Sequence, residues 1–262
     1  GGSRASMALM AAETLGIDLN HIKPVVADTD SVGFNDPTGG SRTTFASGWA
    51  VMNAAEELIE DLRQRAAALW EVSEEEVQWR DGSAVGPDQD TLSLAELAAK
   101  AEVTGGPLSA TATLTAKGAG PGFAVSICDA QVDPETGKTD IVRFTALQDA
   151  GKAIHPAYVE GQMEGGAAQG IGWALNEEYI YDDAGMLENP GFLDYRMPVA
   201  SDLPMIDTVI VEVPNPGHPY GVRGVGEPPI CAVTTAVNHA IDGLITDLPL
   251  SPPRILAAIE AK

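Results

Sequence analysis

Positively charged residues are scarce in this sequence of 262 residues. Fifteen Lys and Arg residues stand against 38 Asp and Glu residues, which gives a formal net charge of −23. Because nucleic-acid binding depends on clustered cations that neutralise phosphates, this balance argues against a nucleic-acid partner. A solvated acidic surface that aids solubility is the simpler interpretation of the charge.

Cysteine is nearly absent, and long apolar runs are missing. Cys128 and Cys231 lie far apart and show no metal-ligand spacing, so we expect buried thiols in a reducing, cytoplasmic compartment and no structural zinc. No apolar run is long enough to cross a bilayer, and no basic segment with an apolar run marks a signal peptide. The chain opens with Gly-Gly and enters a predicted helix almost at once, which is typical of a processed piece or part of a longer polypeptide.

Apolar spacing predicts helices and strands in irregular alternation. Helices are expected at 5–16, 45–70, 94–101, 156–178 and 230–241, a C-terminal turn at 253–261, and strands at 21–27, 77–79, 84–85, 123–132, 138–147, 178–181 and 208–213. A stretch rich in Thr, Gly and Pro near 103–120 predicts a boundary between two lobes, 1–110 and 111–262. Without a regular strand–helix–strand repeat, these elements indicate an α+β fold with mixed sheets and long helices.

The strongest local signal is GVGEPP, residues 224–229. Its glycines, including Gly226, allow a close backbone approach, and Pro228 keeps Glu227 out of the helical region. Glu227 is therefore expected at the start of the last helix, where the dipole favours its ionised form. Such a fixed carboxylate suits a general base. A simple helix-capping role for Glu227 is the alternative that the residues alone favour.

A second signal, TGGSRTT at residues 38–44, precedes the longest predicted helix. Helix-terminal N–H groups, the hydroxyls of Ser41 and Thr43, and the guanidinium of Arg42 all suit a phosphate. The segment lacks the lysine and spacing of a nucleotide-binding P-loop. An ordinary Ser/Thr N-cap explains it equally well.

The third signal is EGQMEGGAAQGIG, residues 160–172. Its glycines indicate a helix packed closely on another backbone or on a flat ligand, and Gln162 and Gln169 fall near one helix face. No strand precedes it, so it is not a dinucleotide-binding fingerprint. The four histidines have no partner at metal-ligand spacing, and packing or surface roles are expected for them.

Five segments in order resemble the molybdopterin-binding subunit of the xanthine dehydrogenase/aldehyde oxidase family of molybdenum hydroxylases. They are AAETLGI, GGSRTT, DAGKAIHP, EGQMEGGAAQGIGWALNEE and GVGEPP, and they span nearly the whole chain. The resemblance implies the carboxy-terminal part of that subunit, with a molybdenum-cofactor-binding domain as its fold.

The resemblance also implies roles for particular residues. The glutamate of GVGE, here Glu227, lies beside molybdenum in this family and is the catalytic base. The cofactor-binding residues that carry over are Gly40, Ser41, Arg42, Thr43, Gln169 and Gly226. The metal is held by the dithiolene of the pterin and not by protein ligands. In bacterial members the cofactor is usually the molybdopterin cytosine dinucleotide.

The expected function is hydroxylation of an aldehyde or N-heteroaromatic substrate with water-derived oxygen. The resemblance implies several partners: the amino-terminal half of the molybdenum subunit, a [2Fe–2S] subunit and an FAD subunit, with a dimer of heteromers as one assembly. Neither the cysteine pattern of the clusters nor a flavin fold occurs here. Carbon monoxide oxidation, cofactor binding or assembly without catalysis, and a solute-binding or structural module remain alternatives.

Overall fold

The computed structural model describes residues 2–26, 28–30, 33–118, 120–230 and 233–261. These residues form two compact units. The N-unit consists of Gly2–Gly120 and Pro216–Val222, and the C-unit of Pro121–Asn215 and Arg223–Lys262. None of the described helices is long and apolar enough to cross a membrane. The roles predicted for the lobes 1–110 and 111–262 stay predictions.

The N-unit is built on two packed helices, α1 (Ser3–Leu15) and α2 (Thr43–Trp70). Gly16 ends α1 in the left-handed conformation, with φ 69°, as the sequence predicts. A Cβ at Gly48 of α2 would lie 2.6 Å from the sulfur of Met10. The glycine therefore permits the close helix contact that buries Met10 and Phe45.

A small sheet and a short helix cover the far end of α2. The strands β1 (Gln78–Arg80), β2 (Ser83–Val85) and β3 (Thr91–Ser93) pair antiparallel in that order. The predicted hairpin is confirmed. Its turn residues Asp81 and Gly82 have φ of 46° and 72°, which suits a two-residue turn. Helix α3 (Leu94–Ala99) follows a capping box. The buried apolar residues here are Leu62, Ala66, Ala67, Val77, Ala84 and Leu97.

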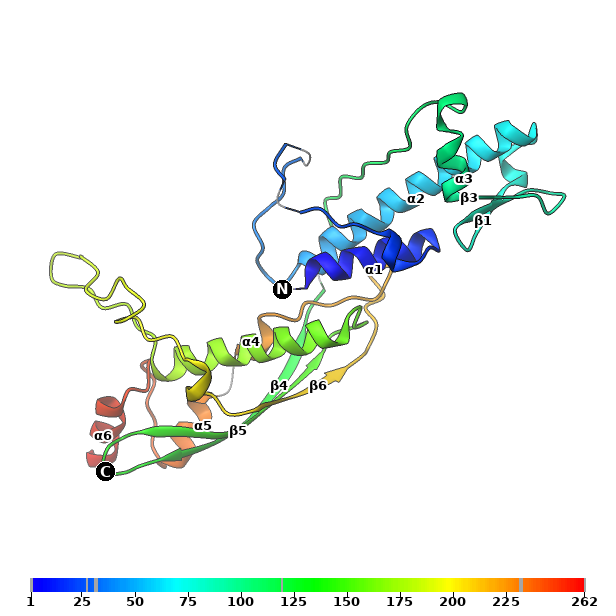
Figure 1. The fold of residues 1–262 in the computed structure, drawn as a ribbon. Helices are drawn as coiled ribbons and strands as arrows, with labels where there is room; N and C mark the ends of the chain where they lie inside the picture. The colour runs from blue at the N-terminus through cyan, green and yellow to red at the C-terminus, as the bar shows by residue number, and fades with distance from the viewer. Residues whose placement is uncertain (1, 27, 31–32, 119, 231–232, 262) are drawn as a thin grey trace. The chain divides into compact units, whose positions relative to one another are not determined.

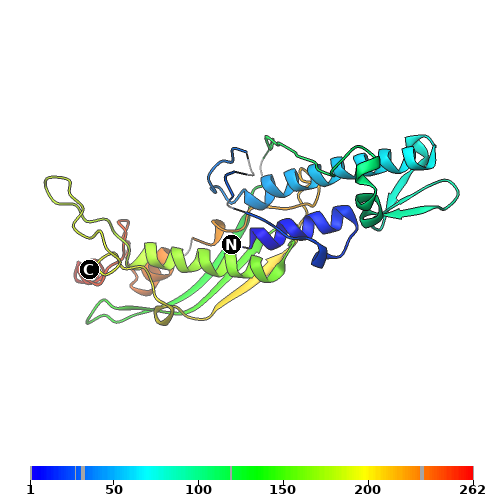
Figure 2. The same ribbon diagram turned by 45° about the horizontal axis from the view of Figure 1, so that its top comes forward.

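The C-unit is a mixed three-stranded sheet with helices on one face (Figures 1 and 2). Its order is β4 (Phe123–Val132), β5 (Thr139–Asp149) and β6 (Ile206–Val211), with β4 and β5 antiparallel and β5 and β6 parallel. Helix α4 (Pro156–Leu175) makes the crossover between β5 and β6, as a parallel pair requires. The fold is therefore α+β with a mixed sheet, as predicted.

Helices α5 (Val233–Ala240) and α6 (Pro252–Glu260) complete the C-unit core. Phe144 and Ala146 of β5 pack with Met163 and Ala167 of α4. The remaining fully buried members of this core are Ile171, Ala174, Val233, Val237, Ile241, Leu250 and Ile255.

The structure corrects two expectations, and a third falls partly outside the described residues. No strand forms at 21–26; Leu19–His21 is a 3₁₀ turn instead, and Pro24 removes a backbone donor. The strand predicted at 178–181 is reduced to one bridge between Tyr181 and Leu187. The helix predicted at 230–241 is described only from Val233, and Cys231 lies outside the described residues.

Candidate functional site

The loop before α2 presents backbone donors. Gly40 and Ser41 have φ of 63° and 55°, and Ser41 is the less usual case because its Cβ disfavours this region. Arg42 occupies the N-cap position, and no side chain there caps the helix. The first N–H groups of a helix have no acceptor within it. The N-cap residue is therefore Arg42 and not a Ser or Thr, and the backbone N–H groups at this helix start suit an anion.

The side chains of the same loop are held in place. The exposed Arg42 donates from Nη2 to the carbonyl of Ala116 over 3.3 Å. The Thr43 hydroxyl donates to that of Thr38 over 3.4 Å. A guanidinium offers five donors in a planar fork that matches a phosphate.

In the C-unit, the backbone of the GVGEPP segment is clamped. Gln148 of β5 is 1% exposed and donates from Nε2 to the carbonyl of Gly224 over 2.8 Å. A Cβ at Gly122 would lie 2.6 Å from the same carbonyl oxygen. The Gly224 carbonyl is therefore held by the buried Gln148 amide. It also lies so close to Gly122 that only glycine fits at position 122.

Helix α4 clamps the segment from its other side. A Cβ at Gly166 would lie 2.6 Å from the carbonyl oxygen of Gly226, and one at Gly170 would lie 2.1 Å from that of Ile230. Such distances are too short for a real Cβ, so these two positions require glycine. Of the two interpretations of the α4 glycines, packing on another backbone is the correct one for Gly166 and Gly170.

Glu227 lies on the surface of this clamped segment. Its side chain is exposed, while the adjoining Pro229 is buried. The N–H of Ile230 donates to the Glu227 carbonyl over 3.2 Å and closes the 3₁₀ turn Pro228–Ile230. The expectation that Glu227 stands at the start of the last helix stays a prediction, because α5 is described only from Val233.

Gln169 lies on the uncovered side of α4. Its side chain is exposed, and a Cβ at Gly161 or Gly165 would meet no atom within 4 Å. Because these three residues follow at intervals of four, they share one helix face. The backbone beside the Gln169 amide is therefore accessible.

A comparison with known families decides what these segments belong to. Residues 1–204 match the model described as the molybdopterin cofactor-binding domain. The chain belongs to this family.

Curated relatives of the chain include subunits of two dehydrogenases. The xanthine dehydrogenase molybdenum-binding subunit of Escherichia coli is 34% identical over 97% of this chain and 35% of its own length. The gamma subunit of the 6-hydroxypseudooxynicotine dehydrogenase complex of Paenarthrobacter nicotinovorans is 32% identical over 98% of this chain and 34% of its own length. The chain thus spans about a third of these relatives.

Solved structures share the fold over nearly all of the domain. A Cu,Mo-CO dehydrogenase matches with a TM-score of 0.86 and 28% identity, over 99% of this chain and 34% of that chain. Quinoline 2-oxidoreductase from Pseudomonas putida 86 matches with a TM-score of 0.83 and 30% identity, over 99% and 35% of the two chains. The molybdenum-hydroxylase large-subunit fold that the sequence predicts is confirmed.

Each unit by itself presents groups that fit one part of a molybdopterin. The N-unit supplies helix-terminal N–H groups and the Arg42 guanidinium, which match a phosphate. The C-unit supplies an uncovered glycine face with the Gln169 amide, which matches a flat heterocycle. Within the described ranges, no group of three or more His, Cys, Asp or Glu residues is arranged to hold a metal ion.

Sequence reasoning missed the ion pair that anchors the GVGEPP segment. Asp149 accepts from the Arg223 guanidinium over 3.1 Å, and both side chains are largely buried. The same carboxylate accepts backbone N–H groups from Gly151 and Val213 at 2.9 and 3.0 Å. The Asp-Ala-Gly segment at the end of β5 can be recognised in the sequence. Arg223, the ion-pair partner of Asp149, lies more than 70 residues further along the chain.

His218 is a packing residue of the N-unit, as expected. It is 4% exposed, and its Nδ1 accepts the N–H of Tyr220 over 3.1 Å. Nε2 lies 3.0 Å from the carbonyl of Phe45, so the neutral tautomer donates there. Burial lowers the pKa of His218, although the bond to Phe45 opposes this shift.

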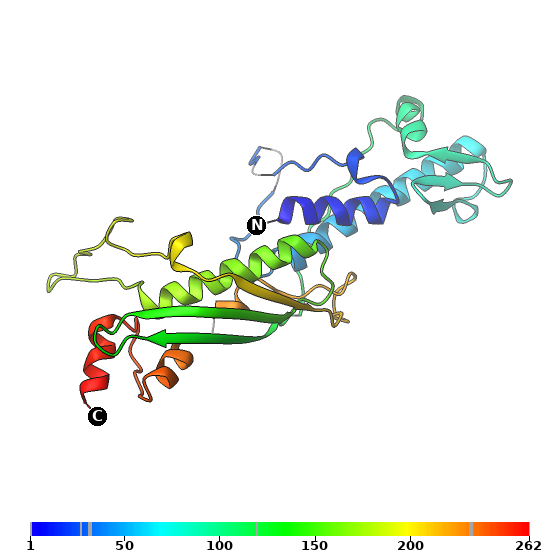
Figure 3. The same cartoon turned by 60° about the horizontal axis from the view of Figure 1, so that its bottom comes forward.

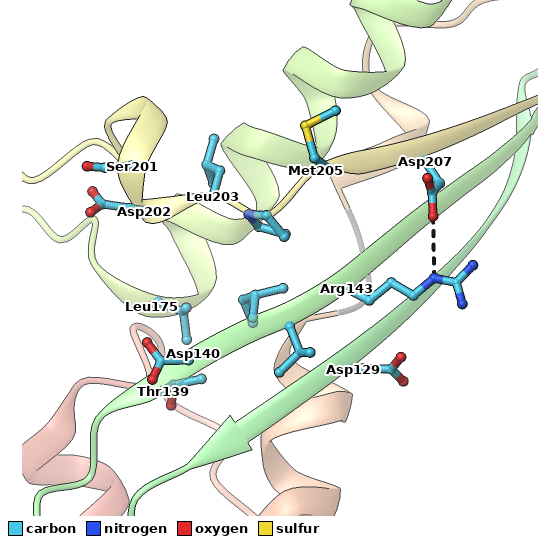
Figure 4. A pocket seen from close by; sticks show the side chains of 13 residues that line it. Asp129, Thr139, Asp140, Arg143, Leu175, Ser201, Asp202, Leu203, Met205 and Asp207 are labelled. Carbon is cyan, nitrogen blue, oxygen red and sulfur yellow. Dashed lines mark hydrogen bonds and ion pairs between the residues drawn. The ribbon is translucent and has the colours of Figure 1, made fainter.

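A cavity of about 670 Å³ opens at the end of the C-unit sheet (Figure 4). None of the predicted site residues lines it. Its charged lining consists of Asp129, Asp140, Arg143, Asp202 and Asp207, and Arg143 pairs with Asp207 over 3.3 Å. This cavity is therefore lined by residues other than those that the sequence analysis singles out.

Proposed function

We propose that the domain is part of a molybdenum hydroxylase that oxidises an aldehyde or an N-heteroaromatic ring with water-derived oxygen. The clamped GVGEPP segment carries this proposal. It holds one exposed carboxylate, Glu227, between two backbone contacts that require glycine. Binding alone does not need a carboxylate there, whereas a general base must be fixed near the proton it takes.

Glu227 acts as that base. When bound there, the molybdenum cofactor would supply the water-derived oxygen and would accept two electrons from the substrate. Glu227 takes the proton of the attacking oxygen, and Gly226 keeps the adjoining backbone against α4. The Gln169 amide, exposed on the glycine face of α4, orients the cofactor ring by hydrogen bonds.

The loop Gly40, Ser41, Arg42 and Thr43 binds the phosphate end of the cofactor. Helix-terminal N–H groups and a guanidinium favour a doubly charged anion over a neutral group. Molybdopterin cytosine dinucleotide is the form we propose, with the metal held by the pterin dithiolene and not by protein side chains.

The activity needs polypeptide outside this chain. The domain spans about a third of its relatives, so we propose that the remaining part of the molybdenum subunit completes the site. A [2Fe–2S] subunit and an FAD subunit then carry the electrons away, in a cytoplasmic complex that can pair into a dimer of heteromers.

Carbon monoxide oxidation is the second candidate. The carbon monoxide dehydrogenase large chain of Hydrogenophaga pseudoflava is 32% identical over 92% of this chain, and the structural match to a Cu,Mo-CO dehydrogenase is close. A substrate screen of the native complex with aldehydes, N-heterocycles and carbon monoxide separates the two.

The catalytic role is tested by Glu227→Gln in the native complex. Because the amide keeps the shape but cannot take a proton, we expect turnover to fall about 100- to 10,000-fold. Molybdenum content should stay near that of the parent, since the substitution leaves the phosphate loop intact. Turnover within a few-fold of the parent would refute the role of Glu227 as base.

The phosphate loop is tested by combining Arg42→Ala with Thr43→Ala. Losing the guanidinium and a hydroxyl weakens the hold on the cofactor, so the ratio of molybdenum to protein should fall. Arg80→Ala, an exposed arginine of the β1–β2 hairpin, is the matched control and should keep its molybdenum. An unchanged ratio in the double variant would contradict the assignment.

A further inference from the structure

The C-unit sheet is apolar on both of its faces. On the inner face, Phe144 and Ala146 of β5 are buried under the helices. On the outer face, the strand register places apolar side chains from all three strands side by side, because Val125 pairs with Leu147 and Leu147 with Val209.

The outer face is exposed in the chain. Its six apolar members, here called the outer patch, are Phe123, Val125, Ile127, Leu147, Val209 and Val211. Exposure is 61%, 62% and 54% for the three β4 members and 43% and 42% for the two β6 members. Figure 3 shows this face with no helix of the C-unit in front of it.

Apolar residues on both faces are typical of a sheet that is covered on both faces. A sheet face meant for water alternates apolar and polar positions instead. Several adjoining apolar side chains from three strands form a contiguous patch, and such patches mark interaction sites when polar residues surround them.

Ion pairs border the outer patch at both ends. At one end, Arg223 pairs with Asp149 and lies over the ring of Phe123, with its guanidinium carbon 5.7 Å from the ring centroid. At the other end, Arg143 pairs with Asp207 over 3.3 Å. The face thus has an apolar centre and a charged rim, which is the anatomy of a protein–protein interface.

The length of the relatives indicates what covers it. The chain matches only 34–35% of the subunits to which it is similar, so roughly two thirds of such a subunit lies outside it.

We propose that the outer patch is the docking surface for the remaining polypeptide of the molybdenum subunit. The partner contributes an apolar face against β4 and β6, and its polar margin meets the Arg143–Asp207 and Asp149–Arg223 pairs. This inference rests on the proposed function, because it takes the partner from that subunit.

The test is thiol labelling at single engineered cysteines. In a background of Cys128→Ala and Cys231→Ala, Val125→Cys and Val209→Cys report on the outer patch from two different strands. Glu135→Cys, in the exposed turn between β4 and β5, is the matched control. Maleimide labelling rates are compared between the chain alone at low micromolar concentration and the native complex that contains the remaining subunit.

We expect all three cysteines to react readily in the chain alone. In the native complex the two outer-patch cysteines should react at least about 100-fold more slowly, while Glu135→Cys keeps its rate. Unchanged outer-patch rates in the complex would overturn the proposal. Slow labelling in the chain alone would also overturn it: concentration-dependent slowing means that a second copy covers the face, and concentration-independent slowing means that the rest of this chain does.

Molybdenum content and substrate oxidation of the same complex separate the two hypotheses. An active, molybdenum-loaded complex with open outer-patch cysteines refutes the docking surface alone. Protected cysteines in an intact complex without molybdenum or activity refute the proposed function alone.

Discussion

Gly170→Ala tests the clamp between α4 and the segment that carries Glu227. The new Cβ would stand 2.1 Å from the carbonyl oxygen, 2.7 Å from the carbonyl carbon and 2.9 Å from the Cα of Ile230. All three are backbone atoms, so the conflict cannot be relieved by rotating a side chain. Either α4 or the segment has to move by about 1 Å to restore a normal contact.

The expected cost follows from two opposing effects. Overpacking of a fixed contact costs about 3 kcal/mol at the upper end of its usual range, while alanine favours a helix over glycine by about 1 kcal/mol. The net destabilisation is about 2 kcal/mol, which corresponds to roughly 30-fold faster hydrogen exchange at the protected amides of α4.

The matched control is Gly165→Ala in the same helix. Its Cβ would meet no atom within 4 Å, so only the helix preference remains. Exchange should slow by roughly fivefold, a gain of about 1 kcal/mol. Hydrogen exchange followed by mass spectrometry on α4 peptides measures both variants. Equal or slower exchange in Gly170→Ala than in the parent would refute the clamp.

Three further predictions concern buried groups whose partners only the structure shows. Asp149→Asn breaks a largely buried ion pair, so the free energy of unfolding in a denaturant titration should fall by about 3 kcal/mol. Asp140→Asn, in the exposed pair with Lys138, should lower it by at most about 0.5 kcal/mol. Similar losses of unfolding free energy in the two variants would contradict the greater strength of the buried pair. Gln148→Leu removes the bond to the Gly224 carbonyl and should lower the turnover of the native complex more than its molybdenum content; a fall in both by the same factor would indicate a structural role only. Burial depresses the pKa of His218 in the folded state, so the stability it contributes is present above its unfolded pKa of about 6.5 and is lost as pH falls towards the folded value. His218→Gln should flatten the change in unfolding free energy of the N-unit between pH 7.5 and 5, and an undiminished slope would exclude His218 as its source.

Periodicity and turn chemistry made the fold of this chain largely predictable. The strand 123–132 is found as predicted, and the helix predicted at 45–70 begins two residues earlier, at Thr43. Both have strong local signals, namely alternation and a long amphipathic repeat. The wrong strand at 21–27 shows the limit, because a short apolar run with a proline does not reveal whether a neighbouring strand is present to pair with it.

The candidate site was predictable as motifs but not as geometry. The glycines at 166 and 170 were recognised, yet only the structure shows that they face carbonyls of residues 226 and 230. Likewise, nothing local distinguishes Gln148 from any other strand residue, since its partner Gly224 is 76 positions away. Long-range pairings of this kind are set by the tertiary fold and produce no recognisable pattern of residue spacing in the sequence.

The most direct test of the central claim is elemental analysis of the native complex for molybdenum and iron. The account predicts close to one molybdenum per copy of this chain, together with iron from the [2Fe–2S] partner. An intact complex that contains the remaining subunit and holds no molybdenum would contradict it, and would leave a domain that has the fold of its family without its chemistry.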